Sequence, residues 1–483
     1  MKNMIKLAAG TAALLLMATS AQATLKTDKV TLKGNMQVKY NKLPSPVDSL
    51  KEAFTEGMFY GRFRTNFFYW DWDVENYATG GKQKDNKNNG VGGSLIYKSA
   101  PFKGFSGTVG LYTSQNLDFF RMDKQDAKYA KSGKDTFSRY NLSTGGHYGI
   151  TDLGQAYLQY DATKKTTVKV GRQMFETVFT KSNDTKMIPN TFDGLTVVSK
   201  DLPKTTVKLA YFTKQKLRDH TVAHDVLAFD PNNKWNQNDD SAINKNLTVA
   251  RIGQDNKLIV GTVTNKSVKN LKASVGYATV PGVVSNITLE AHYTIPVGSM
   301  KVVPGVRYMM QYDALGANYG VANLKGNQTN YTNPNSLDSN LLCARIDFKQ
   351  GAFLGRLGYS KVADKADIVA PWRGFPTGGF TRAMAQYNWY ANTQTIMLRA
   401  GYDFGKAKIL PGFSVMVRYA MQDFDDNKPG VQADSNIIHM DVRQNIGHSS
   451  ELKFRLGMVD AKPTNGKTDV SYNEYRLEYN YFF

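Results

Sequence analysis

The sequence is poor in cysteine and histidine, and it has no long apolar run beyond its first residues. Cys343 is the single cysteine among 483 residues, so no intrachain disulfide can form. No later stretch reaches the ~18 apolar residues that a membrane-spanning helix needs. The six histidines form neither a zinc-ligand pattern nor a Ser/His/acid arrangement. These absences argue against a disulfide-stapled domain, a helical membrane protein and an enzyme. We expect no cofactor and no bound metal. Calcium binding at an Asn/Asp-rich loop is left open.

The composition is that of a membrane β-barrel, although the mean hydropathy alone would indicate a soluble protein. The mean hydropathy of −0.43 is that of a soluble protein. A strand of a membrane barrel alternates polar and apolar residues, however, so its average hydropathy cancels. The sequence has 27 tyrosines and 25 phenylalanines, the residues that form aromatic girdles in such barrels.

The amino terminus has the pattern of a secretory signal. Lys2 and Lys6 precede an apolar stretch, residues 7–17, and residues 21–23 form a small-residue Ala-Gln-Ala cleavage site. We therefore expect residues 1–23 to be removed after Ala23 on export. The formal net charge of +20 could suggest nucleic acid, but export makes small anions and anionic lipids better partners.

The last thirteen residues, 471–483, alternate without interruption. Tyr475, Leu477 and Tyr479 fall on one face of a strand, and Glu474 and Arg476 fall on the other. The chain ends on Phe483. A closing strand of an outer-membrane barrel has this pattern, with its aromatic face in lipid. The terminal phenylalanine also resembles the signal by which barrels are handed to the outer-membrane assembly machinery.

From residue 58 onward, strand-like segments of about ten residues follow one another, with short and long connections in alternation. This alternation predicts an all-β fold, a transmembrane antiparallel up-and-down β-barrel of about 18 strands with long extracellular loops and short periplasmic turns. Residues 24–57 form an amino-terminal periplasmic or lumenal segment, with a short helix that Asp48 could cap. Weaker strand patterns at 30–40 and 246–252 leave the count open by about two.

Arginine and lysine recur on the polar face of the predicted strands. An arginine that faces lipid at the midplane costs about 2–4 kcal/mol, so these residues must face the lumen. They could fill the lumen and pair with acidic residues, or they could form a path of guanidinium groups that bind carboxylates in series. We favour the path for the set, which consists of Arg62, Arg64, Lys169, Lys208, Arg307, Arg345, Arg356, Arg399, Arg418, Arg443, Arg455 and Arg476.

The third long connection, residues 175–192, contains turn formers and also apolar residues. Met187, Ile188 and Phe192 would be out of place in a purely solvated loop. A loop folded into the pore and a surface loop with a local apolar cluster both fit this pattern.

Three stretches carry a family resemblance. Residues 171–173 (Gly-Arg-Gln), 182–184 (Ser-Asn-Asp) and 186–194 (Lys-Met-Ile-Pro-Asn-Thr-Phe-Asp-Gly) resemble the third-loop region of the OprD family of outer-membrane porins. Residues 92–99 and 105–111 are similar to the second and third strands of that family. The pattern runs over most of the chain and is specific between about 91 and 213.

The resemblance implies an eighteen-stranded barrel, substrate-selective uptake of small nutrients and a lumenal arginine ladder for carboxylates. It also implies a constriction by the third loop, with Ser182, Asn183, Asp184, Lys186, Pro189 and Phe192 as the constriction residues. The chain departs from the family pattern at Lys186, where arginine is usual, and at the acidic Asp193. Arg172 shares its parity with Val168 and Val170, so its direction requires a bulge or an interface position.

The sequence therefore predicts a porin of the bacterial outer membrane for passive, selective uptake of small carboxylate-bearing or anionic solutes. The alternatives are a general diffusion porin and a structural or adhesive surface protein. The expected partners are small solutes, outer-membrane lipids and, through Phe483, the assembly machinery. No nucleic acid is expected, and assembly as a homo-trimer is left open.

Overall fold

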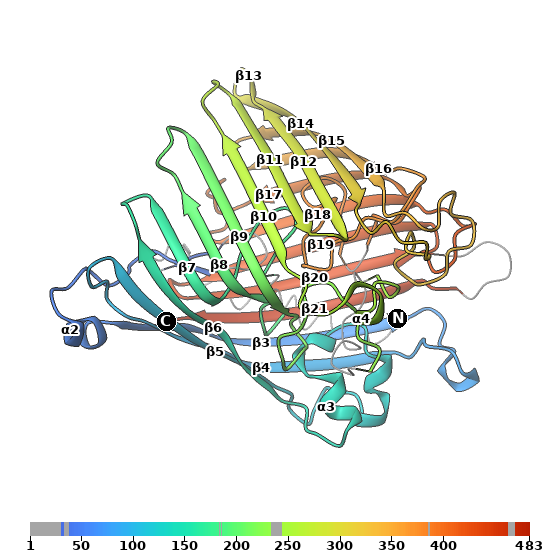
Figure 1. The fold of residues 1–483 in the computed structure, drawn as a ribbon, viewed down its shortest axis with the longest axis horizontal. Helices are drawn as coiled ribbons and strands as arrows, with labels where there is room; N and C mark the ends of the chain where they lie inside the picture. Colours follow the sequence, from blue (N-terminus) through green and yellow to red (C-terminus); the bar gives the residue numbers. More distant parts are fainter. Residues whose placement is uncertain are drawn as a thin grey trace.

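The computed structural model describes residues 30–32, 38–182, 184, 186–232, 244–384, 387–461 and 469–483. The predicted signal peptide and Asn183 lie outside these ranges. Within them, the chain forms a closed antiparallel barrel (Figure 1), which confirms the predicted fold class. None of the described helices has the length and hydropathy needed to cross a membrane.

Eighteen strands close the barrel within the described ranges when the short β13 is taken as the continuation of β12, because both pair with β14. The strands are β3 (Met58–Trp72), β4 (Asn86–Lys98), β5 (Phe105–Gln115), β6 (Ile150–Asp161), β7 (Thr166–Gln173), β8 (Thr191–Ser199), β9 (Thr205–Lys216), β10 (Leu258–Asn265), β11 (Leu271–Val280), β12 (Val284–Tyr293), β13 (Ile295–Val297), β14 (Met300–Asp313), β15 (Ser339–Gln350), β16 (Phe353–Val362), β17 (Gln394–Asp403), β18 (Phe413–Asp423), β19 (Ser435–Ile446), β20 (Ser450–Asp460) and β21 (Tyr472–Phe482).

The closing contact joins β21 to β3. Tyr475 lies opposite Tyr69, and Phe482 lies opposite Arg62. The backbones of Gly61 and Phe483 donate hydrogen bonds to each other, at 3.2 and 3.3 Å. The two ends of the barrel therefore meet on the side of the short turns (Figure 1).

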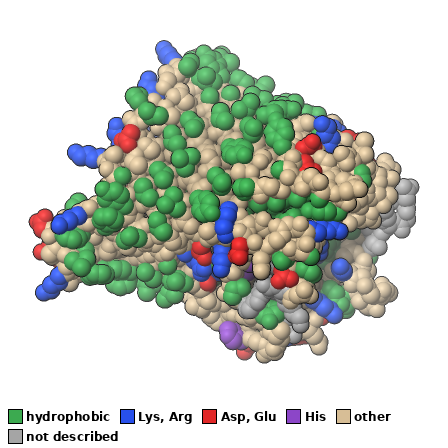
Figure 2. Space-filling model, in the orientation of Figure 1, with side chains coloured by type: hydrophobic (Ala, Val, Ile, Leu, Met, Phe, Trp, Pro, Cys, Tyr) green, Lys and Arg blue, Asp and Glu red, His purple; other side chains and the backbone are tan. Residues whose placement is uncertain are grey.

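The alternation of side chains separates an outer face from a lumenal face. On β3, Phe59 and Phe63 are 65% and 45% exposed, whereas Arg62 and Arg64 are 2% and 0% exposed. The same alternation continues around the barrel, and Figure 2 shows hydrophobic side chains over the wall that β7–β14 form. This apolar surface is the one that meets lipid in a membrane barrel.

The two weaker strand patterns do not add strands to the barrel. Residues 246–252 form no strand, since Val249–Ile252 is a short helix, α4. Within 30–40, β1 (Val30–Leu32) and β2 (Val38–Tyr40) pair with each other and not with the barrel.

The helix expected near Asp48 is α2 (Leu50–Thr55), and its N-cap is Ser49. The Ser49 hydroxyl accepts from the Glu52 amide at 3.1 Å, while the Glu52 carboxylate accepts from the Ser49 amide. This reciprocal capping box satisfies two amides, which Asp48 as N-cap would not do.

Strand β4 starts at Asn86, six residues before the segment 92–99 that resembles the second strand of the family. Its early residues pair with β3, and Asn88 and Asn89, which point to opposite faces of the wall, both bind the long loop after β5. Asn88 donates to the Ser132 carbonyl at 3.0 Å, and Asn89 donates to the Leu117 carbonyl at 3.0 Å. These asparagines look like loop residues in the sequence because their partners lie elsewhere in the chain.

The long loops pack inside the barrel and form its largest apolar core. Phe179, Leu227, Trp372 and Trp389 belong to one buried cluster, to which the inner faces of several strands also contribute. The interior is therefore a folded core with a channel left along one side.

The barrel end allows a test of assembly. We expect Phe483→Ala to lower several-fold the amount of folded barrel in outer membranes, because the terminal aromatic is the proposed recognition point. The fraction of heat-modifiable protein on unheated gels measures this. Phe59→Ala, which removes another exposed phenylalanine near the same barrel edge, is the control. Equal yields of both variants would contradict the expectation.

Candidate functional site

A cavity of about 1250 Å³ follows the inner wall of β16–β21. At one end, loop residues line it, among them Lys325, Asn427 and Lys428. At the other end, its walls are Ala352, beside a short turn, and Ser414, near the start of β18. The cavity therefore reaches from the side of the long loops to the side of the short turns.

Five of the twelve basic residues predicted to line a solute path border this cavity. They come from the consecutive strands β17–β21, and they are Arg399, Arg418, Arg443, Arg455 and Arg476. Side chains on these strands point alternately outward and inward, and each of these arginines lies at an inward position.

Arg399 stands between two other arginines. It lies directly opposite Arg356 on one side and Arg418 on the other. Asp347 binds Arg356 through two contacts of 2.5 and 2.9 Å. Within the described ranges, the structure pairs neither Arg399 nor Arg418 with a carboxylate, and Arg418 donates to the Arg382 carbonyl at 3.0 Å. Like charges directly opposite each other are unfavourable, so this row is electrostatically costly to the fold.

The other three predicted arginines of the cavity do have acidic partners. Arg443 lies 3.0 Å from Glu451, and Arg455 lies 3.0 Å from Asp441. Arg476 lies 2.6 Å from Glu474. Among these five arginines, the two without a carboxylate partner in the described ranges therefore lie side by side on β17 and β18.

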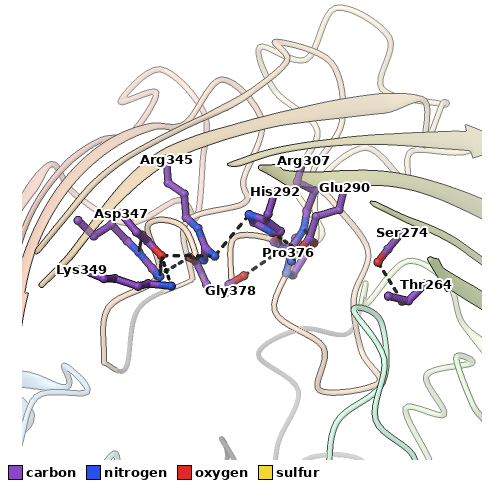
Figure 3. Close-up of polar contacts among 12 residues, drawn as sticks. Thr264, Ser274, Glu290, His292, Arg307, Arg345, Asp347, Lys349, Pro376 and Gly378 are labelled. Atoms are coloured by element: carbon purple, nitrogen blue, oxygen red, sulfur yellow. Dashed lines mark hydrogen bonds and ion pairs between the residues drawn. The ribbon is translucent and has the colours of Figure 1, made fainter. Parts of the chain in front are cut away.

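Three further predicted residues hold a loop instead of lining the cavity (Figure 3). Arg307 donates to the carbonyls of Pro376 and Gly378 at 2.6 and 3.0 Å. Arg345 and Arg356 both donate to the Gly379 carbonyl. These arginines fix the long connection between β16 and β17, which we call the sixth loop (residues 363–393), inside the barrel.

Arg62 and Arg64 hold the third loop in the same way. Both bind Asp184, and Arg64 also lies 2.6 Å from Glu478. Lys208 donates to the Glu176 carbonyl at 2.8 Å. Lys169 and Arg62 border a second cavity of about 250 Å³. These four residues lie outside the main cavity, so the structure divides the predicted set into a group along one wall, groups that anchor loops, and Lys169, which donates to the Tyr157 hydroxyl of β6 at 3.2 Å.

The third loop folds into the barrel, as one of the two interpretations of its sequence required. Ser182, Met187, Ile188 and Phe192 are all fully buried. Of the predicted constriction residues, Lys186 borders the main cavity, and Asp184 borders the second one. Pro189 belongs to the same inward segment but borders neither cavity.

The sixth loop was not expected to face the pore, yet it contributes much of the cavity wall. Phe375, Arg382, Tyr387 and Tyr390 line it. The sequence contained a signal, because this connection is rich in aromatic residues, as the third loop is in apolar ones.

Basic loop residues that sequence reasoning also missed surround Lys186. Lys131, Lys134 and Arg218 line the same part of the cavity. Lys186 Nζ lies 2.7 Å from Asp135. Burial lowers the pKa of Lys186 to about 8 despite this carboxylate, and burial together with Lys134 and Arg139 lowers the pKa of Lys131 to about 8. Both ammonium groups therefore titrate just above neutral pH.

Comparison with known proteins identifies the family. The model of the OprD family of outer membrane porins matches residues 152–483. The chain belongs to this family. Membership confirms the resemblance and indicates a channel in the bacterial outer membrane. No curated protein sequence matches the chain.

Solved structures share the fold at low identity. Acinetobacter baumannii OccAB3 is 16% identical and has a TM-score of 0.67, over 88% of this chain and 99% of that one. Pseudomonas aeruginosa OpdK with vanillate is 14% identical, with a TM-score of 0.66 over 88% and 98%. A BenF-like porin from Pseudomonas fluorescens Pf-5 is 14% identical, with a TM-score of 0.66 over 89% and 99%.

Removal of one carboxylate should release the third loop. Asp184→Ala leaves Arg62 and Arg64, 2% and 0% exposed, without their shared partner. Loss of one partner of a buried ion pair costs about 3–5 kcal/mol, so we expect a lower unfolding temperature and a larger, fluctuating single-channel current. Asp118→Ala is the control, because the Asp118 side chain is 90% exposed. A current identical to that of the unmodified protein would refute the anchoring role.

Proposed function

We propose that this porin takes up small carboxylate-bearing or other anionic solutes by passive, substrate-selective diffusion along the β16–β21 wall. The observation that carries the proposal is the row formed by Arg356, Arg399 and Arg418. This row of like charges destabilises the fold, and it leaves two guanidinium groups without a carboxylate. A bound solute that supplies the negative charge would explain why the row exists.

The chemistry of the guanidinium group supports a carboxylate. Its planar fork of donors matches the two oxygens of a carboxylate and binds them bidentately. Conduction also requires that each site binds weakly enough to release the solute, and several sites in series meet this requirement. Arg399 and Arg418 followed by the partly neutralised Arg443 and Arg455 form such a series.

The loop side of the cavity adds an attractive field. Lys131, Lys134, Lys186 and Arg218 line this part, and Lys186 and Arg218 lie 2.7 and 3.5 Å from one acidic residue, Asp135. A cleft lined by one sign of charge concentrates ions of the opposite sign. Anions would therefore be enriched at this end of the cavity before they reach the arginines of the wall.

Two inward loops favour selectivity over general diffusion. The third and sixth loops fill much of the lumen and leave a cavity along one wall. An adhesive surface protein would instead present its aromatic loop residues outward, whereas Trp372 and Trp389 are 0% and 1% exposed. OpdK, a protein of the same fold, has been crystallised with vanillate, which is a carboxylate.

A triple substitution tests the path. We expect Arg399→Ala, Arg418→Ala and Arg443→Ala together to lower carboxylate flux about tenfold or more, since each change removes one docking site from a series. Flux of organic acids into proteoliposomes measures it. Lys98→Met with Lys169→Met is the control, because both lysines border the second cavity. If the triple variant folds and keeps its flux, the proposed path is wrong.

The pH dependence tests the basic loop group separately. Lys131 and Lys186 each have a pKa of about 8, lowered mainly by burial, so both lose their proton as the pH rises from about 7 to 9. The cavity then loses two positive charges while the arginines remain charged. We expect anion selectivity, measured from reversal potentials, to fall across this range.

The variant that lacks both titrating groups is the control for this experiment. Lys131→Gln with Lys186→Gln should show a low anion selectivity that does not change between about pH 7 and 9. An unmodified protein whose reversal potential is constant over this range would contradict the assignment.

A further inference from the structure

Lysines gather on the short turns along one side of the barrel. They lie in the four consecutive turns β4–β5, β6–β7, β8–β9 and β10–β11, and all of them are exposed. Figure 2 shows Lys and Arg side chains spaced along the edge that these turns form. In these four turns, whose residues the structure describes completely, the only acidic residue is Asp201. We call this set the lysine arc, and it consists of Lys103, Lys164, Lys165, Lys200, Lys204, Lys266 and Lys269.

The rest of the short-turn rim is less basic. The turns β13–β14, β15–β16 and β19–β20 contain no lysine, although Lys301 and Lys349 lie close to the first two. The turn between β17 and β18 carries Lys406 and Lys408. The lysines of the rim are therefore concentrated in the arc, and an even coat of solubilising charge does not describe them.

Backbone hydrogen bonds join neighbouring turns of the arc. The Lys200 amide donates to the Lys165 carbonyl at 3.0 Å, and the Lys266 amide donates to the Lys204 carbonyl at 3.0 Å. Each bond links the end of one turn to the start of the next. Lysines from adjacent turns are thus held next to each other by the backbone, so their ammonium groups can reach the same anion.

The one carboxylate of these turns belongs to this framework. Asp201 accepts hydrogen bonds from the hydroxyls of Thr163 and Thr166 at 3.0 and 2.5 Å, and from the Ser199 hydroxyl at 3.3 Å. Within the described ranges, the structure pairs no lysine of the arc with a carboxylate. The arc therefore presents its positive charge to a partner outside the chain.

The arc lies at the level of the lipid headgroups. Strands β7 and β10, which end and begin at these turns, have 8 residues each. At about 3.3 Å per residue and a tilt of about 40°, such a strand crosses roughly 20 Å of an apolar band that is about 25 Å tall. Phe105 and Tyr160, which stack at 4.6 Å beside the turns, mark the aromatic girdle at the edge of this band. Where a wall is this low, basic side chains at its edge extend into the headgroup layer.

Exposed apolar residues lie between the lysines of two turns. Leu202 stands between Lys200 and Lys204, and it is 59% exposed. Val268, between the two lysines of the β10–β11 turn, is also 59% exposed. A surface that combines cations with apolar side chains matches the boundary between phosphates and acyl chains. A soluble anion would contact only the cations.

We propose that the lysine arc is a binding site for anionic phospholipids of the periplasmic leaflet. Lysines of adjacent turns contact one headgroup phosphate, while Leu202 and Val268 contact the acyl chains. Each lysine close to an anionic lipid surface adds to the attraction, and the hydrogen-bonded turns let neighbouring lysines act on the same headgroup. The site lies on the outer rim of the barrel, so it is separate from the solute path in the lumen.

Native mass spectrometry of the full chain in mild detergent tests this site. We expect the unmodified protein to bind phosphatidylglycerol about tenfold more tightly than phosphatidylcholine, because only the former has a net negative headgroup. Lys165→Gln/Lys200→Gln removes one cation from each of two linked turns and should lower the affinity for phosphatidylglycerol about tenfold. Lys406→Gln/Lys408→Gln is the matched control. It removes the same charge from the same rim outside the arc, and it should lower the affinity by less than about twofold.

Four outcomes would overturn the proposal. Equal losses in the two variants would mean that the lipid responds to total charge, and equal binding of the two lipids would mean that headgroup charge plays no part. Displacement of the lipid by excess inorganic phosphate would indicate a site for soluble anions. Binding of purified peptidoglycan that Lys165→Gln/Lys200→Gln abolishes, with lipid binding unchanged, would assign the arc to the cell wall. Heat modifiability on gels verifies that each variant contains a folded barrel.

Discussion

The cost of an arginine in lipid is the constraint on which the structure depends. Strands alternate with a period of two, so a closed barrel in a membrane must place its charged rows inward. This chain carries 61 basic and 41 acidic residues, and its basic excess is therefore drawn toward the lumen and the loops. An inward arginine then has three partners available: a carboxylate such as Asp347, the backbone of an inward loop, or the solvent of a channel. Arg356 uses the first two, and Arg399 lies beside the third.

The inward loops and the channel are two consequences of the same charge pattern. On the β14–β16 wall, guanidiniums bind carbonyls of the sixth loop and fix it across the lumen. On β3, Arg62 and Arg64 hold the third loop through Asp184. On the β17–β21 wall, five arginines border the main cavity, although Arg418 also donates to the Arg382 carbonyl of the sixth loop. The same inward basic residues therefore set the positions of the pore and of the loops. A substitution at one loop anchor should change the single-channel current.

Local patterns predicted the barrel, because parity is a property of a few consecutive residues. The closing strand expected at 471–483 is β21, Tyr472–Phe482, with Arg476 inward and Tyr481 outward. The division of the arginines could not be predicted, since it depends on contacts such as Arg307 with Pro376, 69 residues apart. A sequence shows that Arg307 and Arg399 share a face, but it does not show which of them a loop will cover. Arg172 was the informative exception: its parity conflicted with its charge, and the structure places it on the outer wall beside Asp193.

The proposed function depends on the two guanidiniums, Arg399 and Arg418, that have no carboxylate partner among the described residues. The most direct measurement is the reversal potential of the unmodified channel in a planar bilayer under a gradient of potassium chloride, followed by replacement of chloride with organic acids of increasing size. We expect an anion-selective reversal potential, a small conductance and a current that persists with small carboxylates. A large conductance with no ion preference, or a preference for cations, would contradict the proposed function.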